Sequence, residues 1–211
     1  MASNKLNWAR MTLIWAALLI ALAIPIAAAT MSPLLAWREP VYITAGFAGV
    51  VALGLMLVQP LLIGGYLPGL RSYREKRAHR WIGCLLAAAV MLHVAGLWIT
   101  SPPDVIDALL FASPTPFSAF GVVAMWAIFA AAFLAVFRQR LRLRPRRWRL
   151  GHRVLVMVTV LATVIHALLI EGTMETISKA ALCLLVVAAT LKVVIGLWAR
   201  EKRTATPVAT P

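Results

Sequence analysis

HRWIGCLLAAAVMLH, at residues 79–93, and HRVLVMVTVLATVIH, at residues 152–166, are two apolar stretches of equal length that begin and end with histidine. They hold all four histidines of the chain. A separation of 14 residues makes almost four whole turns of α-helix, about 21 Å along the axis, so both histidines of a stretch lie on the same helix face. The sequence therefore predicts two helices that carry histidines at two matching depths.

Apolar residues dominate the whole chain, since 62% of the residues are hydrophobic and the mean hydropathy is +0.87. These values exclude a soluble globular domain of 211 residues. Runs of about 20 apolar residues recur, the length that crosses the hydrocarbon core of a membrane. We predict one all-α polytopic membrane domain at residues 1–203 and a disordered tail at 204–211. The six transmembrane helices are expected at residues 9–30, 42–64, 79–100, 116–137, 151–170 and 178–199.

The net charge of +14 is unevenly distributed along the chain. Basic residues gather in the first ten positions, at 71–80, at 138–153 and at 200–203, whereas the remaining loops hold five of the seven acidic residues. Basic loops stay on the cytoplasmic side, so both termini are predicted to be cytoplasmic. Topology and contact with anionic lipid head groups explain these charges without a nucleic-acid partner. A docking surface for an acidic redox partner is the alternative explanation.

The two helices with histidines are the third and fifth spans, and they run in the same direction through the membrane. His79 should therefore lie beside His152 near the cytoplasmic surface, and His93 beside His166 nearer the outer surface. Ionisable side chains inside a membrane are costly and usually functional. A helix bundle can enclose a haem, and two axial histidines leave its iron without an open position, which favours electron transfer.

We therefore predict a six-transmembrane-helix haem-binding bundle with two haems b. The expected axial ligands of the haem iron are His79 with His152, and His93 with His166. Arg80 and Arg153 follow the histidines of the cytoplasmic pair directly and are candidates to bind the anionic haem propionates.

Two alternatives use the same histidines differently. A small permease or transporter subunit could place them in a proton path, although the spans lack the carboxylates that such a path commonly uses. A cytochrome b with a single haem would use His93 and His166 alone.

Spans two to six, at about residues 42–199, resemble the ferric reductase-like transmembrane domain family. The resemblance rests on Gln59-Pro60 through Pro68-Gly69, on His79 to Gly83 with His93, and on Trp148 to Arg153 with His166. This family includes NADPH oxidases, ferric reductases and the haem-binding membrane subunit of the periplasmic methionine sulfoxide reductase system. The resemblance implies that the third and fifth helices hold two b-type haems.

The resemblance also implies a route for electrons. NADPH oxidases and ferric reductases continue into a cytoplasmic domain for FAD and NAD(P)H, whereas this chain ends 12 residues after Ala199. We therefore expect an oxidoreductase component of a bacterial inner membrane that receives electrons from a separate cytoplasmic flavin reductase or from quinol. The expected acceptor is a periplasmic redox protein, ferric iron or oxygen. An FMN in the chain itself is implied by this similarity alone, with no residue assigned to it.

Overall fold

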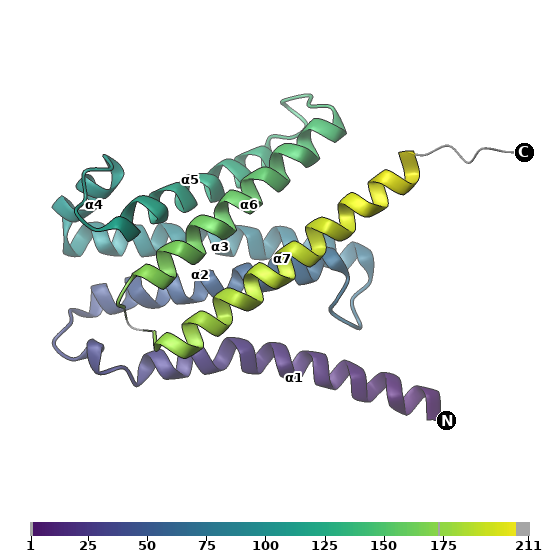
Figure 1. Ribbon diagram of the computed structural model, residues 1–211, viewed down its shortest axis with the longest axis horizontal. Helices are drawn as coiled ribbons and strands as arrows, with labels where there is room; N and C mark the ends of the chain where they lie inside the picture. Colours follow the sequence, from purple (N-terminus) through teal and green to yellow (C-terminus); the bar gives the residue numbers. More distant parts are fainter. Residues whose placement is uncertain (1, 173, 206–211) are drawn as a thin grey trace, which may run out of the picture.

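The computed structural model describes residues 2–172 and 174–205, and all of its regular structure is helical (Figure 1). The elements are α1 (Ala2–Thr30), the 3-10 helix η1 (Pro33–Leu35), α2 (Pro40–Gly64), α3 (Ser72–Thr100), α4 (Pro102–Leu109), α5 (Pro116–Val136), α6 (Pro145–Leu169) and α7 (Thr176–Ala205). Six of these helices are long and apolar enough to cross a membrane. The predicted all-α fold with six spans is confirmed, and α4 is a short additional helix.

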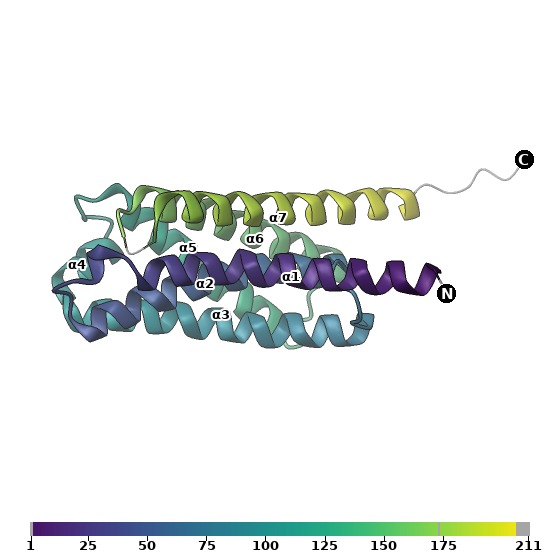
Figure 2. The same ribbon diagram turned by 90° about the horizontal axis from the view of Figure 1, so that it is seen from below.

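The helices form an elongated bundle with two distinct ends (Figures 1 and 2). One end carries the start of α1, the end of α7 and the loops before α3 and α6, and we call it the termini end. The opposite end carries α4, and we call it the α4 end. The tail predicted at residues 204–211 overlaps the last two residues of α7, and residues 206–211 lie outside the described part of the chain.

Proline, glycine and glutamate set the ends of the helices. Proline occupies the first turn of α2, α4, α5 and α6. Backbone N–H groups in the first turn have no partner within the helix, so the N–H that proline lacks costs no hydrogen bond there. Gly65 ends α2 in the left-handed conformation, with φ of 69°. The carboxylate of Glu175 accepts hydrogen bonds from the backbone N–H groups of Ser178 and Ile177, both at 2.7 Å, at the start of α7. These hydrogen bonds, led by that of Ser178, lower the pKa of Glu175.

Two helix hairpins, α2 with α3 and α5 with α6, provide the most extensive packing in the bundle. α7 packs against α2 and α6 and so joins the hairpins, while α1 contacts chiefly α2 and α7. The buried core is centred on α2, where Leu53, Met56 and Leu57 pack with Val160 of α6 and Val186 of α7. α3 and α6 come from different hairpins and hardly touch each other directly.

Gly96 brings α3 close to α2. A Cβ atom at this position would lie 2.7 Å from the Cβ of Ala45 and 3.4 Å from the carbonyl oxygen of Val41. Both neighbours belong to the α2 backbone or sit directly on it, so they cannot move aside without separating the helices. The close approach of α2 and α3 therefore depends on the absence of a side chain at residue 96.

Replacing Gly96 with Ala is expected to destabilise the protein. Overpacking costs about 1–3 kcal/mol, which exceeds the roughly 1 kcal/mol that alanine gains over glycine in a helix. The melting temperature of the detergent-purified protein measures the effect. Gly196→Ala is the matched control, because a Cβ atom there would meet nothing within 4 Å. A Gly96→Ala variant that melts at or above the wild-type temperature would contradict this packing.

Candidate functional site

The structure brings the four histidines together as two pairs between α3 and α6. His79 faces His152 toward the termini end, and His93 faces His166 toward the α4 end. In both pairs the ring centroids are 6.5 Å apart and the ring planes are inclined by 78°. We call them the termini-side pair and the α4-side pair. Two sites with the same separation and inclination are thus built from one pair of helices.

The gap between the rings of each pair has the length that one metal ion requires. Metal–imidazole bonds of about 2.0–2.1 Å, with roughly 1.2 Å from each nitrogen to its ring centroid, place two centroids about 6.5 Å apart across the metal. Within the described residues, no group of three or more His, Cys, Asp or Glu side chains could hold a bare ion. A haem brings four nitrogen ligands of its own, so two facing imidazoles suit a haem iron better than a lone ion.

Both rings of the α4-side pair are oriented by backbone carbonyls of the neighbouring helix. His93 donates from Nδ1 to the carbonyl oxygen of Ala45 in α2 at 2.7 Å, and His166 donates from Nδ1 to that of Phe117 in α5 at 2.8 Å. A carbonyl can only accept, so each Nδ1 carries the proton and each Nε2 keeps a free lone pair. The α4-side pair therefore has the tautomer that a metal ligand through Nε2 needs.

Two glycines make room for these rings. Gly49 follows Ala45 by one helical turn, and a Cβ atom there would lie 3.1 Å from Nδ1 of His93. Gly121 follows Phe117 by one turn, and its Cβ atom would lie 2.8 Å from Nδ1 of His166. On each helix, one residue thus supplies the carbonyl and the residue a turn later leaves space for the imidazole.

These contacts extend the internal repeat of the sequence from the histidines to the helices beside them. The second histidine helix repeats the first after 73 residues (152 − 79 and 166 − 93), and the neighbouring helix repeats after 72 residues (117 − 45 and 121 − 49). The two hairpins are therefore equivalent units, each of which supplies one histidine to each pair. Gly49 and Gly121 were not predicted as functional residues, although the interval of 72 residues between them, close to the 73-residue interval of the histidines, was a signal that could have found them.

The termini-side pair is oriented differently. The ring of His79 faces the backbone carbonyl of Gln59 in α2, and the side-chain amide of Gln59 also lies against this ring. His152 stacks on Trp148, with centroids 5.7 Å apart and planes inclined by 11°. The buried Nδ1 of His152 points toward the carbonyl of Ala131 in α5 but has no hydrogen bond of standard geometry among the described residues.

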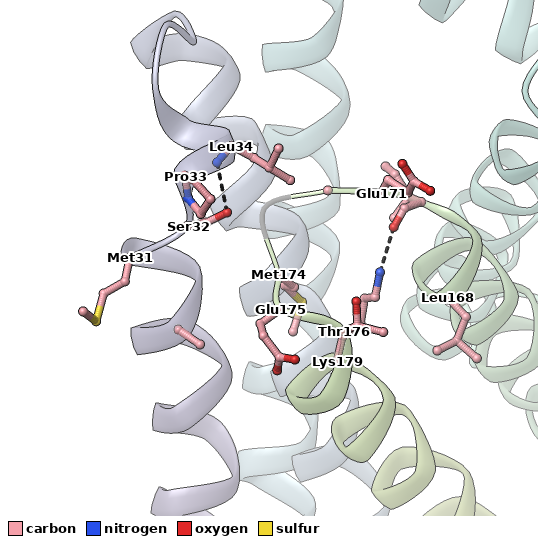
Figure 3. Close-up of a pocket in the computed structure, with 13 residues that line it drawn as sticks. Met31, Ser32, Pro33, Leu34, Leu168, Glu171, Met174, Glu175, Thr176 and Lys179 are labelled. Carbon is pink, nitrogen blue, oxygen red and sulfur yellow. Dashed lines mark hydrogen bonds between the residues drawn. The ribbon is translucent and has the colours of Figure 1, made fainter.

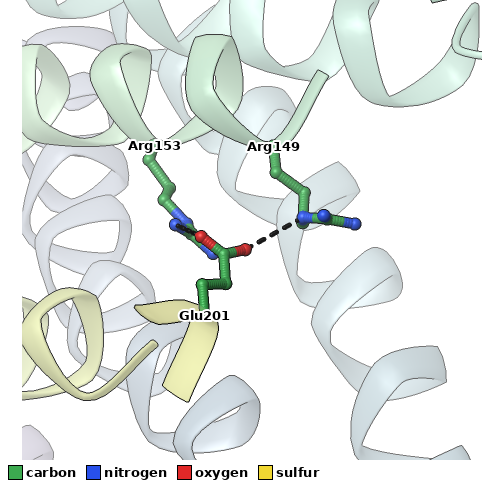
Figure 4. Close-up of polar contacts among 3 residues, drawn as sticks. All are labelled: Arg149, Arg153 and Glu201. Atoms are coloured by element: carbon green, nitrogen blue, oxygen red, sulfur yellow. Dashed lines mark hydrogen bonds and ion pairs between the residues drawn. The ribbon is translucent and has the colours of Figure 1, made fainter. Parts of the chain in front are cut away.

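The two arginines predicted to bind propionates have different surroundings. Arg153 donates from both terminal nitrogens to the carboxylate of Glu201 in α7, each at 2.8 Å, and Arg149 donates to the same carboxylate at 3.0 Å (Figure 4). Arg80 is exposed and lines a hollow of about 340 Å³ with Arg77 and other residues of α3. Glu201 thus holds Arg153 at the termini end, and the propionate role of both arginines stays a prediction.

A cavity of about 760 Å³ lies at the α4 end, between the end of α1 and the segment that joins α6 to α7 (Figure 3). The buried Lys179 points into it and donates from Nζ to the carbonyl oxygen of Ile170 at 2.7 Å. Ile170 ends α6, and its own N–H donates to the carbonyl of His166. Lys179 therefore fixes the end of the helix that carries one histidine of the α4-side pair.

Fold and site together define a polytopic helical membrane protein with two facing histidine pairs inside its bundle. The chain matches the family described as "Ferric reductase like transmembrane component" over residues 48–163, which is 116 of its 211 residues. The chain belongs to this family. Neither a curated protein nor a solved structure matches it.

Membership in this family confirms the class of protein that the sequence predicted. The protein is an integral membrane component of transmembrane electron transfer, and haem binding is typical of its family. The matched residues include Gly49, His79, His93, Gly121 and His152. His166 lies three residues beyond the end of the match.

Replacing Gly121 with Val is expected to push the imidazole of His166 away from the carbonyl of Phe117 and so to lower the haem content of the purified protein. Pyridine haemochrome analysis measures the haem content per chain. Gly151→Val is the matched control: it adds the same side chain to a helix of the bundle, but its Cβ atom would meet only the tip of Leu134 at 3.5 Å. Equal haem content in both variants would show that Gly121 is not needed to seat the ring.

Proposed function

We propose that this protein carries electrons across the membrane through two haems b, one held by His79 and His152 and the other by His93 and His166. The observation that carries the proposal is the identical geometry of the two pairs, 6.5 Å and 78° in each, on the same two helices. Haem held by such a pair would supply a one-electron iron couple, and the two histidines of the pair would leave no coordination position open to other molecules.

The spacing of the pairs supports transfer over the full thickness of a membrane. A separation of 14 residues corresponds to about 21 Å along α3 and α6. Centred in a hydrocarbon core of about 30 Å, each pair would lie roughly 5 Å from one surface. With a single pair, electrons would have to cross most of the membrane thickness in one step. Two pairs divide this distance into shorter electron-transfer steps.

The chain's own residues prepare each imidazole for this role. Carbonyl oxygens of Ala45 and Phe117 hold the protons of the α4-side pair on Nδ1, so that Nε2 is free to bind iron. Gly49 and Gly121 let the rings approach the neighbouring helix closely. The apolar helices around the pairs exclude water and suit the mainly apolar haem.

The direction of electron flow in this proposal follows from charge. The basic segments 71–80 and 138–153 lie at the termini end, which the positive-inside rule assigns to the cytoplasm. Electrons from a separate flavoprotein reductase or from quinol would enter at the termini-side pair. They would leave from the α4-side pair to an acceptor on the outer face, which is a periplasmic redox protein, ferric iron or oxygen.

A reduced-minus-oxidised optical spectrum with pyridine haemochrome quantitation tests the proposal first. We expect about two b haems per chain, and the loss of one haem in either His93→Ala or His79→Ala. Met91→Ala is the control, because Met91 lies near His93 in sequence but its side chain is exposed. A protein that is colourless when purified from haem-replete cells would overturn the proposal in favour of a histidine proton path. One haem per chain that His79→Ala leaves intact would favour the single-haem alternative.

The inclination of the rings predicts the electron paramagnetic resonance spectrum of the oxidised protein. The imidazole planes of each pair are inclined by 78°, and such nearly perpendicular planes would leave two d orbitals of a bound haem iron almost equal in energy. We therefore expect strongly anisotropic low-spin signals from both haems. Rhombic low-spin spectra, which parallel imidazole planes produce, would contradict this geometry.

A further inference from the structure

Trp148 lies one helical turn before His152 on α6, and the two rings are stacked. Their centroids are 5.7 Å apart and their planes are inclined by only 11°. Residues four apart on a helix share a face, so the indole lies directly against the imidazole. Trp148 is half-buried near the termini end of the bundle. A flat ring thus covers one face of a histidine of the termini-side pair.

The repeat of the two hairpins does not extend to this stack. The residues one turn before the other three histidines are Glu75, Ala89 and Ala162. Alanine has no ring, and the carboxylate of Glu75 turns toward the end of α2, where a Cβ atom at Gly65 would lie 3.7 Å from it. Phe117 meets His166 edge-on, with centroids 5.9 Å apart and planes inclined by 63°. The parallel stack therefore needs an explanation particular to His152.

Two contacts hold the indole of Trp148 in place. Its Nε1–H donates to the carbonyl oxygen of Leu134 at 3.3 Å. Leu134 lies in the last turn of α5, where carbonyls lack a partner within the helix. The guanidinium carbon of Arg138 lies 5.2 Å from the ring centroid of Trp148, which is a cation–π contact. The ring that faces His152 is therefore fixed to the end of the neighbouring helix.

His152 has a weaker polar support than the rings of the α4-side pair. The torsion that turns an imidazole about its bond to Cβ is broad, so a histidine ring needs a contact to fix its plane. His93 and His166 have hydrogen bonds of 2.7 and 2.8 Å for this purpose. Nδ1 of His152 points toward the carbonyl of Ala131 but makes no hydrogen bond of standard geometry among the described residues. The flat face of Trp148 supplies the contact that fixes the plane instead.

We propose that Trp148 is a positioning residue that fixes the ring plane of His152 and thereby the inclination of 78° in the termini-side pair. This inference rests on the function proposed above. The inclination of two axial imidazoles decides how the d orbitals of a bound haem iron would split, so Trp148 would act on that haem through His152. The α4-side pair has the same inclination with hydrogen bonds as its support.

Electron paramagnetic resonance of the oxidised, haem-loaded protein tests this role. Trp148→Leu removes the flat ring and lets His152 turn, so the strongly anisotropic signal of one haem is expected to shift toward a rhombic one. Trp148→Phe keeps a flat ring one turn before His152 and is expected to retain the wild-type signal. Trp8→Leu is the matched control, because Trp8 is 61% exposed on α1 at the same end of the bundle. The signal of the second haem should stay unchanged in all three variants.

The haem that responds is identified by removing the other one. In a His93→Ala background, which retains the termini-side pair, the difference between leucine and phenylalanine at position 148 should persist. In a His79→Ala background, which retains the α4-side pair, both variants should give the same spectrum.

The possible failures are distinguishable. A wild-type protein without two bis-histidine haems would overturn the proposed function, and this inference with it. Two bis-histidine haems whose signals stay the same in Trp148→Leu would overturn the role of Trp148 alone. Equal shifts in the leucine and phenylalanine variants would also overturn it, because the flat ring would then not be what matters.

A second variant covers the case in which Trp148→Leu loses a haem. Trp148→Met adds a longer side chain that is flexible and not flat, and its signal is compared with that of Trp148→Phe in the same way. Loss of one haem per chain in both the leucine and methionine variants, with two haems kept by phenylalanine, would support the role. Loss of the same haem in the phenylalanine variant as well would overturn it.

Discussion

Every polar group inside the hydrocarbon core of a membrane must find its partner within the protein, and this constraint organises the bundle. An imidazole has two nitrogens, so a histidine turned toward a haem iron must satisfy its second nitrogen on the neighbouring helix. The hydrogen bonds from His93 to Ala45 and from His166 to Phe117 do this, and each joins the two helices of one hairpin. The same bonds that prepare the rings therefore also help to set the register of α2 against α3 and of α5 against α6.

This constraint also explains where small residues are needed. A carbonyl in a helix is surrounded by side chains, so a ring can reach it only where one of them is missing. Gly49 and Gly121 provide that opening one turn after the accepting carbonyl. Gly96 serves the packing of the helices themselves, because it lies directly against Ala45. Glycines in this protein thus mark close approaches, some of rings to backbone and some of one helix to another.

The sequence was sufficient for much of this structure because its strongest signals are periodic. Apolar runs of the length of a membrane predicted the six spans, and the equal spacing of the histidines predicted which of them would face each other. Contacts between residues far apart in sequence carry no such signal. Gly49 is 44 residues from His93, Gly121 is 45 from His166, and Glu201 is 48 from Arg153. α4 was not predicted as a helix, because eight residues between prolines are too few to show a helical period.

α3 and α6 supply every histidine, yet they hardly touch each other. Each hairpin is closed internally by its own packing and hydrogen bonds, and the space between the two histidine helices is where the prosthetic groups are proposed to lie. A haem bound at each pair would then be a cross-link between two units that can enter the membrane one after the other. Maturation of the protein would then amount to joining two folded halves, which residues 101–115 connect along the chain and which iron–nitrogen bonds would connect across the bundle.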